Sequence, residues 1–185
     1  VDVEVSGKYS TDITHVFEYL PLTSTSTQLL DAVRVYNEYI DGDLPRQEQF
    51  FRSHMRRPGY VGVMAISDDK VVGFVFGSTS LVGQWWHERV AANVGSEHPA
   101  LQNAWVLTQL NVLQAYRNKG IGQTLHDRIL AQQTSPRVLL STQVANTGAQ
   151  RFYKRNDWYI LHDGFRFSAN DEPYKILAKK LTDND

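Results

Sequence analysis

The sequence predicts an α/β protein whose mixed central sheet is flanked by helices. Short apolar runs of strand type alternate with amphipathic helical segments along most of the chain. A strand–helix–strand step across residues 104–144 implies a locally parallel pair, because such crossovers join parallel neighbours. Short turns at 68–69 and 169–172 instead imply antiparallel hairpins.

Length and composition indicate one domain. The chain has 185 residues, of which 42% are hydrophobic, enough for a sizeable core but cramped for two domains. We expect an arm at residues 1–14, one domain over 15–182 with an insertion at 81–103, and a tail at 183–185.

Charge and residue usage exclude several classes of function. A net charge of −1 indicates neither a nucleic-acid backbone nor an anionic membrane as partner. The chain has 0 cysteines, which excludes disulfides, thiolate metal sites and a cysteine nucleophile. No apolar run is long enough to span a bilayer, and residues 1–14 lack the pattern of a signal peptide. We therefore expect a cytoplasmic protein.

The first quarter of the chain predicts a strand and a helix. The strand covers residues 16–20 and ends at Pro21, and Thr25 and Gln28 have the spacing of a capping box that opens a helix. The inner face of that helix is expected to hold Leu29, Val33, Tyr36 and Ile40.

A second helix and a hairpin follow. Asp43 and Pro45 are suited to open the helix, and residues 60–67 and 70–80 predict the two strands. The insertion 81–103 is too long for a plain loop in a compact protein. One helical face within it is expected to carry Trp86, Arg89, Val90 and Asn93.

The second half predicts a mostly apolar strand over 104–113, a helix ending near Gln133, and a strand over 137–144. Asn146 or Thr147 is suited to cap a short helix that turns Ala149, Phe152 and Tyr153 inward. The last two strands are expected near 158–168 and 173–181.

The segment between the buried strand and its following helix predicts an anion site. Gly120 and Gly122 let a ligand approach the backbone, and the first amides of a helix have no intrahelical acceptor. The helix dipole favours a pyrophosphate there, and Arg117 and Lys119 add positive charge.

Three kinds of glycine loop compete for this segment. A Walker A loop requires Gly-Lys-Ser/Thr, which is absent, and a dinucleotide fingerprint requires a third glycine after Gly122. The remaining pattern, Arg/Gln-x-x-Gly-x-Gly/Ala, matches residues 117–122.

With this loop, the chain resembles the GNAT superfamily of N-acetyltransferases over most of its length. The preceding strand reaches Val112, and Asn146, Ala149, Phe152 and Tyr153 match the family pattern after the next strand. The resemblance implies a GNAT-type fold, acetyl-CoA as cofactor, an amine acceptor and no metal.

The resemblance also assigns the cofactor site. The pantetheine arm would lie between two diverging strands, with an amide near Leu110 polarising the thioester carbonyl. A second wall would come from residues 143–146, with Thr124 near the phosphates. The implied cofactor-binding residues are Leu110, Asn111, Val112, Arg117, Asn118, Lys119, Gly120, Ile121, Gly122, Gln123, Asn146 and Tyr153.

Tyr153 has two interpretations. The resemblance makes it the general acid that protonates the departing thiolate. Helical spacing alone makes it a half-buried aromatic on the inner face of a short helix. The general base that would deprotonate the amine is not identified, because Gln109 stands where many family members carry a glutamate. Other candidates are Glu38, Asp41, Asp43, His87 and Glu88, although residues of these types are more often ordinary surface charges.

The acceptor site would lie between the first two helices and the last hairpin. Glu38 and Asp41 would attract a cationic amine there, or simply end a helix in solvent. Trp85 and Trp86 would form a wall over the substrate, a packing anchor, or a contact in a homodimer. A non-catalytic acyl-CoA-binding module and a nucleotide-binding protein are the alternative functions.

Overall fold

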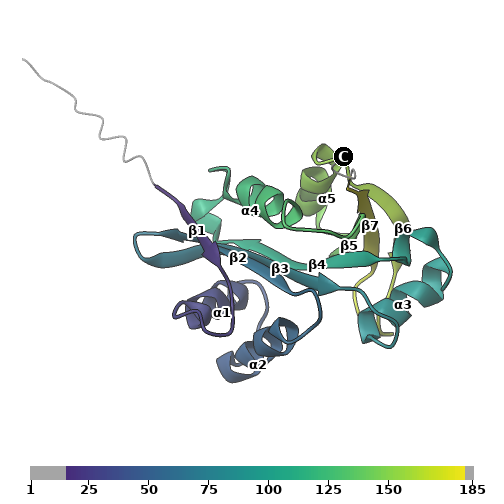
Figure 1. Ribbon diagram of the computed structural model, residues 1–185, viewed down its shortest axis with the longest axis horizontal. Helices are drawn as coiled ribbons and strands as arrows, with labels where there is room; N and C mark the ends of the chain where they lie inside the picture. The colour runs from purple at the N-terminus through teal and green to yellow at the C-terminus, as the bar shows by residue number, and fades with distance from the viewer. Residues whose placement is uncertain (1–15, 182–185) are drawn as a thin grey trace, which may run out of the picture.

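The computed structural model describes residues 16–181, so the expected arm and tail lie outside the described residues. Seven strands form one sheet in the order β1-β2-β3-β4-β5-β7-β6 (Figure 1). The strands are β1 (Glu18–Pro21), β2 (Val61–Ser67), β3 (Lys70–Thr79), β4 (Ala104–Val112), β5 (Arg137–Gln143), β6 (Tyr159–Phe165) and β7 (Tyr174–Lys180). The predicted mixed sheet is confirmed: β4 and β5 run parallel, and every other neighbouring pair is antiparallel.

Helices cover both faces of this sheet. They are α1 (Leu29–Asn37), α2 (Leu44–Met55), α3 (Trp85–Val94), α4 (Ile121–Leu130) and α5 (Thr147–Arg155), with short 3-10 turns at Pro99–Leu101 and Gln114–Tyr116. α1 and α2 lie on one face and α4 and α5 on the other, while α3 lies at the β6–β7 end (Figure 1). Each face therefore buries its own apolar cluster.

The parallel pair is short, and this creates an opening in the sheet. β4 and β5 are in register only from Ala104–Arg137 to Val106–Leu139. Beyond that point β4 stays with β3 as far as Val112, whereas β5 stays with β7 as far as Gln143. The distal halves of the two strands therefore diverge, as the family resemblance implies.

Two predictions about the first helix are wrong. Gln28 precedes α1 with no side-chain cap, because the segment before it forms a turn in which the Thr23 amide donates to the Ser26 hydroxyl (2.9 Å). Ile40 is 48% exposed because α1 ends at Asn37, before that residue. The cap predicted for α2 is confirmed, since the Asp43 carboxylate accepts from the Arg46 amide (2.8 Å).

The insertion 81–103 holds α3, but its inner face differs from the prediction. His87, Val90 and Ala91 are buried, whereas Arg89 and Asn93 are exposed. Because α3 begins at Trp85 and packs against β6, its buried stripe is rotated by about one residue.

Candidate active site

The loop between β4 and α4 adopts conformations suited to present its backbone outward. Asn118 has φ +60° and Gly120 has φ +80°, both in the left-handed region. Asparagine and glycine are the residues that adopt this region at least cost, which explains their places here. A Cβ built on Gly120 would meet nothing within 4 Å, so the space over the loop is open.

The amides of this loop have no acceptor within residues 16–181. No hydrogen bond there uses the N–H groups of residues 118–123, and the first intrahelical amide, that of Thr124, donates to the Gly120 carbonyl (3.0 Å). Gly120 precedes α4 without offering a side-chain cap. Successive donors of this kind at the positive end of a helix dipole are suited to bind an anion, which stays a prediction here.

The opening between the strands exposes alternate backbone groups of β4. Leu113 donates to the Val72 carbonyl on β3 (2.9 Å), and antiparallel pairing alternates along a strand. The backbone groups of Asn111 therefore face β3, whereas those of Leu110 and Val112 face the opening. Of the three β4 residues predicted to bond the cofactor through the backbone, two are oriented to do so.

Side chains from two elements converge on one of these groups. The Val112 carbonyl accepts from the Tyr39 hydroxyl (2.6 Å) and from Arg117 Nε (3.3 Å). The Arg117 guanidinium also lies over the Tyr39 ring, 5.1 Å from its centroid. The loop is thus anchored to the segment that follows α1, a link that no sequence pattern indicates.

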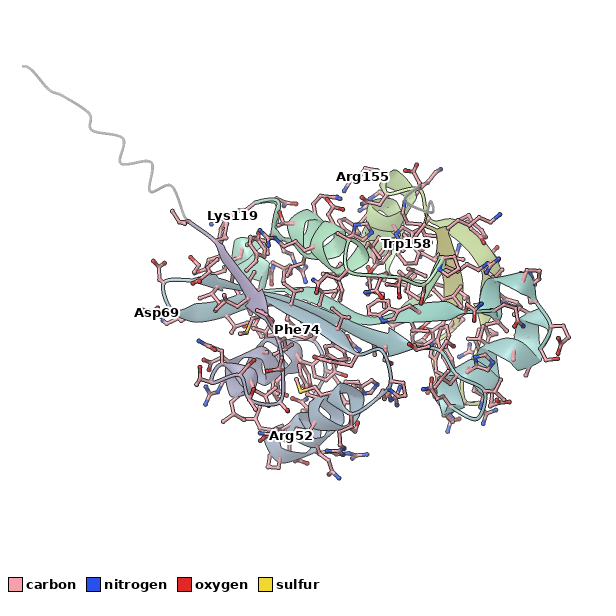
Figure 2. The ribbon with its side chains drawn as sticks, in the orientation of Figure 1. Arg52, Asp69, Phe74, Lys119, Arg155 and Trp158 are labelled. Carbon is pink, nitrogen blue, oxygen red and sulfur yellow. The ribbon has the colours of Figure 1, made fainter. Side chains whose placement is uncertain are left out.

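Two other side chains of this region, Lys119 and Gln123, differ in their contacts. Lys119 lies at the N-terminal end of α4 (Figure 2), with its ammonium 5.1 Å from the Tyr116 ring centroid. The side-chain amides of Gln123 and Asn156 form two reciprocal hydrogen bonds (2.7 and 3.1 Å), and the Gln123 amide also donates to the Asp127 carboxylate (2.9 Å). The Gln123 side chain therefore holds α4 to the end of α5, and its backbone amide is the group left for a ligand.

Helix α5 carries the candidate acid. Asn146 caps it as predicted, with its side-chain oxygen accepting from the Ala149 amide (3.0 Å). Tyr153 is 7% exposed and contacts the rings of Phe152 and Trp158 with centroids 5.2 and 5.3 Å away. Burial raises the pKa of the Tyr153 phenol above its usual range, so the phenol stays protonated at physiological pH.

The Tyr153 hydroxyl is not sealed in the core. It makes no hydrogen bond within residues 16–181, yet no fully buried side-chain oxygen or nitrogen there lacks a partner. The oxygen therefore belongs to the small exposed part of the side chain. The packing interpretation is confirmed for the Tyr153 ring, whereas its role as general acid stays a prediction.

A buried hydrogen bond fixes the position of Trp158, whose ring contacts Tyr153. The Trp158 indole N–H donates to His126 Nε2 (3.0 Å), and His126 Nδ1 lies 2.8 Å from the Asp127 carboxylate. Because the indole only donates, Nε2 carries no proton and His126 is the Nδ1–H tautomer. Burial lowers the pKa of His126, which keeps the ring neutral.

Three of the candidate bases are committed to structural bonds. Asp43 caps α2, Glu88 accepts from the Gly83 amide (2.7 Å), and His87 Nδ1 lies 2.9 Å from the Ser80 hydroxyl. Glu38 and Asp41 are exposed between α1 and α2. On β4 itself Gln109 accepts from the Asn111 side chain (3.1 Å), and neither amide can take a proton.

The two tryptophans of the insertion have different environments. Trp86 is half-buried, and its indole N–H donates to the Ser141 hydroxyl on β5 (3.2 Å). Trp85 is 58% exposed and stacks on Phe167 at 5.3 Å. Trp86 is therefore a packing anchor between α3 and the sheet, while Trp85 presents an aromatic face to solvent.

Sequence patterns missed one pair of residues on the acceptor side. Tyr36 of α1 was expected only as core, but its raised pKa results first from burial and then from the nearby Tyr174 phenol of β7. Gln143 of β5 donates to the Tyr174 hydroxyl (3.4 Å). The Tyr36 phenol of α1 thus lies within electrostatic range of the Tyr174 phenol of β7, a proximity that only the fold reveals.

Taken together, the structure combines a diverging parallel strand pair with a loop whose backbone amides have no acceptor among residues 16–181. The chain belongs to the acetyltransferase (GNAT) family, whose model matches residues 26–158. Within residues 16–181 no helix is long and apolar enough to cross a bilayer, and no group of three His, Asp or Glu side chains is arranged to hold a metal.

Several known proteins resemble this chain in sequence or in fold. A GCN5-like protein acetyltransferase of Mycobacterium tuberculosis is 26% identical, over 88% of this chain and 96% of the relative. A putative GNAT acetyltransferase from Desulfovibrio desulfuricans superposes with TM-score 0.65 at 14% identity, covering 89% of this chain and 99% of that one. Arabidopsis thaliana NAA60, solved with a bisubstrate analogue, gives TM-score 0.66 at 15% identity, covering 90% and 99%.

Proposed function

We propose that this protein transfers the acetyl group of acetyl-CoA directly to a primary amine of a small molecule or peptide. The observation that carries the proposal is the run of amides at residues 118–123, which have no acceptor among the described residues. A diphosphate fits such a run, because each oxygen accepts from several N–H groups and the helix dipole adds attraction.

The residues present fit the rest of that carrier. The backbone groups of Leu110 and the amide of Val112 face the opening between β4 and β5, where an amide-containing pantetheine arm would find partners, whereas the Val112 carbonyl already accepts from Tyr39 and Arg117. Acetyl-CoA supplies the activated thioester. The Leu110 amide is placed to stabilise negative charge on the carbonyl oxygen as the amine attacks.

Tyr153 serves as general acid in this proposal. Its hydroxyl is protonated and unbonded within the described chain, and its ring is held by Phe152 and Trp158. A phenol of raised pKa is a weak donor to a thiolate whose conjugate acid has a pKa near 8.5. The transfer therefore depends on placing the hydroxyl at the sulfur as charge develops.

The amine proton leaves to solvent in this proposal. An alkylamine of pKa about 10.4 costs about 4.6 kcal/mol to deprotonate at pH 7. β4 offers Gln109 and Asn111 at the opening, and neither accepts a proton. Exposed Glu38 and Asp41 favour a cationic acceptor electrostatically, and Tyr36 and Tyr174 would line its site between α1 and β7.

Thiol release from acetyl-CoA over a panel of polyamines, aminoglycosides and peptide N-termini tests the activity. We expect release with at least one amine, and abolished cofactor binding in Gly120→Asp, which places bulk and negative charge on the loop. Calorimetry with acetyl-CoA, ATP and NAD distinguishes the alternatives. Acetyl-CoA binding without turnover on any amine would favour a sensing module, whereas comparable ATP or NAD affinity would favour a nucleotide-binding protein.

A further inference from the structure

A cavity separate from the opening between β4 and β5 lies where α5 packs over the outer strands of the sheet. Its volume is about 460 Å³. The residues lining this α5–β6 cavity are Thr147, Gln150, Arg151, Lys154, Trp158, Tyr159, Ile160, Lys175 and Leu177. None of these lining residues is among those predicted to bind the cofactor, so the cavity is distinct from the proposed cofactor site although α5 contributes to both.

The cavity has an apolar floor. Trp158 and Leu177 are 5% and 3% exposed, so each presents an apolar surface from the packed interior. Tyr159 and Ile160, on the edge strand β6, remain 43% and 53% exposed. Large apolar side chains left open beside a cavity of this size are typical of ligand sites, which are mostly apolar with few polar groups.

The rim of the cavity is cationic. Thr147, Gln150, Arg151 and Lys154 follow the i, i+3, i+4, i+7 spacing and so share one face of α5. Neither Arg151 nor Lys154 forms an ion pair with a carboxylate of residues 16–181. Lys175 is neutralised by Asp163 at 2.8 Å. Two uncompensated positive charges therefore stand over the apolar floor.

We propose that the α5–β6 cavity binds a small amphipathic anion, an aromatic or medium-chain aliphatic carboxylate or sulfonate. Its apolar body would rest on Trp158, Ile160 and Leu177, and its anionic group would pair with Arg151 and Lys154. A volume of about 460 Å³ admits one fused ring system or an alkyl chain of several carbons. The charge of the rim selects against neutral or cationic molecules of the same shape.

Occupancy of this cavity reaches the proposed active site through one shared residue. Trp158 contributes to the floor, contacts the Tyr153 ring and donates to His126 of α4. A ligand that pressed on the indole would act on the helices that carry the acid and the anion loop. The binding proposal itself is independent of the acetyltransferase proposal.

Fluorescence titration with 1-anilinonaphthalene-8-sulfonate, in saturating CoA, tests the site. We expect one saturable site, displaced by octanoate, and at least tenfold weaker binding of the uncharged N-phenyl-1-naphthylamine. The double variant Arg151→Glu/Lys154→Glu should weaken sulfonate binding at least tenfold. Arg155→Glu makes the same type of charge change on α5 outside the cavity (Figure 2), and should change the affinity less than twofold.

A second variant guards against misfolding of the double variant. Ile160→Glu changes a half-exposed floor residue on β6, and should also weaken the sulfonate at least tenfold while retaining the wild-type circular dichroism spectrum. The proposal is overturned if saturable binding is absent, or if both cavity variants bind the probe as the wild type does. A companion titration without CoA checks where the probe binds. If the probe binds only when CoA is absent, and the cavity variants do not change that binding, the probe lies in the opening between β4 and β5 and the proposed site is refuted.

Discussion

Tyr153 combines a buried ring with a hydroxyl that makes no hydrogen bond within residues 16–181. Tyr153→Phe removes the oxygen and retains the ring contacts with Phe152 and Trp158. If the hydroxyl protonates the leaving thiolate, we expect kcat to fall about 10²-fold or more while acetyl-CoA affinity changes less than about threefold. Steady-state kinetics and calorimetry measure the two quantities.

Tyr159→Phe is the matched control for this prediction. It makes the same chemical change at an exposed position on β6, and should leave kcat unchanged. Equal turnover in Tyr153→Phe and wild type would remove Tyr153 from the acid role and leave the residue as core alone.

His126 predicts how the stability of the fold depends on pH. Its pKa is lowered mainly by burial, so below pH about 6.5 the unfolded chain binds a proton that the folded chain resists. Stability is therefore present above that pH and is lost as pH falls toward the folded-state pKa. His54 has a pKa lowered by burial too and contributes in the same direction.

Urea denaturation at pH 7.5 and pH 5.5 measures this effect. His126→Gln should be destabilised at pH 7.5, because the Trp158 contact is altered, but should lose less further stability at pH 5.5 than the wild type. The same loss between the two pH values in both proteins would show that His126 does not titrate on unfolding.

At the scale of elements, a glycine on β3 permits the close packing of Trp105. The β3–β4 register shifts between Phe76 and Gly77, and a Cβ on Gly77 would lie 2.1 Å from the Val106 carbonyl and 2.4 Å from the Trp105 ring. The Trp105 indole is 1% exposed and donates to the Gly59 carbonyl (2.8 Å). The backbone atom cannot give way without breaking the sheet pairing.

Gly77→Ala should therefore destabilise the protein by about 3 kcal/mol or more, as overpacking against the backbone does. Chemical denaturation measures it, with Gly148→Ala as control. A Cβ at Gly148 meets nothing nearer than 3.7 Å, so this α5 variant should be neutral or up to about 1 kcal/mol more stable. A Gly77→Ala protein as stable as wild type would show that β3 and β4 separate more freely than the packing indicates.

Local chemistry explains which elements were predictable from the sequence. Asp43 before Pro45 and Asn146 before α5 mark helix starts by side-chain acceptors, and both caps were predicted correctly. The glycine loop was equally visible, because its residue types follow from its own backbone needs. The capping box at Thr25 failed because the hydroxyls of Thr23, Thr25 and Ser26 form hydrogen bonds within a turn instead.

Contacts between distant segments were not predictable. Nothing in the sequence predicts that the Tyr39 hydroxyl bonds the Val112 carbonyl, or that Tyr36 and Tyr174 influence each other electrostatically, because these pairs come into range only once the sheet order is fixed. The rotation of α3 had the same cause, since β6 decides which side of that helix is covered. The glycine loop of the candidate site could be predicted because it depends on neighbouring residues, whereas the strands and helices around it are positioned by the topology of the sheet.

At the scale of the whole molecule, the sheet consists of two parts joined by a short seam. The β4–β5 register spans Ala104–Val106 against Arg137–Leu139. Side-chain links supplement it, chiefly Trp158 to His126 and Gln123 to Asn156. A molecule lying in the opening would contact both parts, so its binding should tie them together.

We expect acetyl-CoA to protect both walls from amide hydrogen exchange. At a concentration 100-fold above Kd, mass action adds about 2.7 kcal/mol of stability, or a rise in Tm of about 5–11 °C for a chain of this size. Protection should increase at residues 118–123, at residues 110–112 of β4, and around residues 141–146 across the opening. Gly120→Asp should show neither the rise in Tm nor the added protection. Protection confined to residues 118–123 would mean that a bound diphosphate is held at the loop alone, and that the diverging strands do not receive the rest of the carrier.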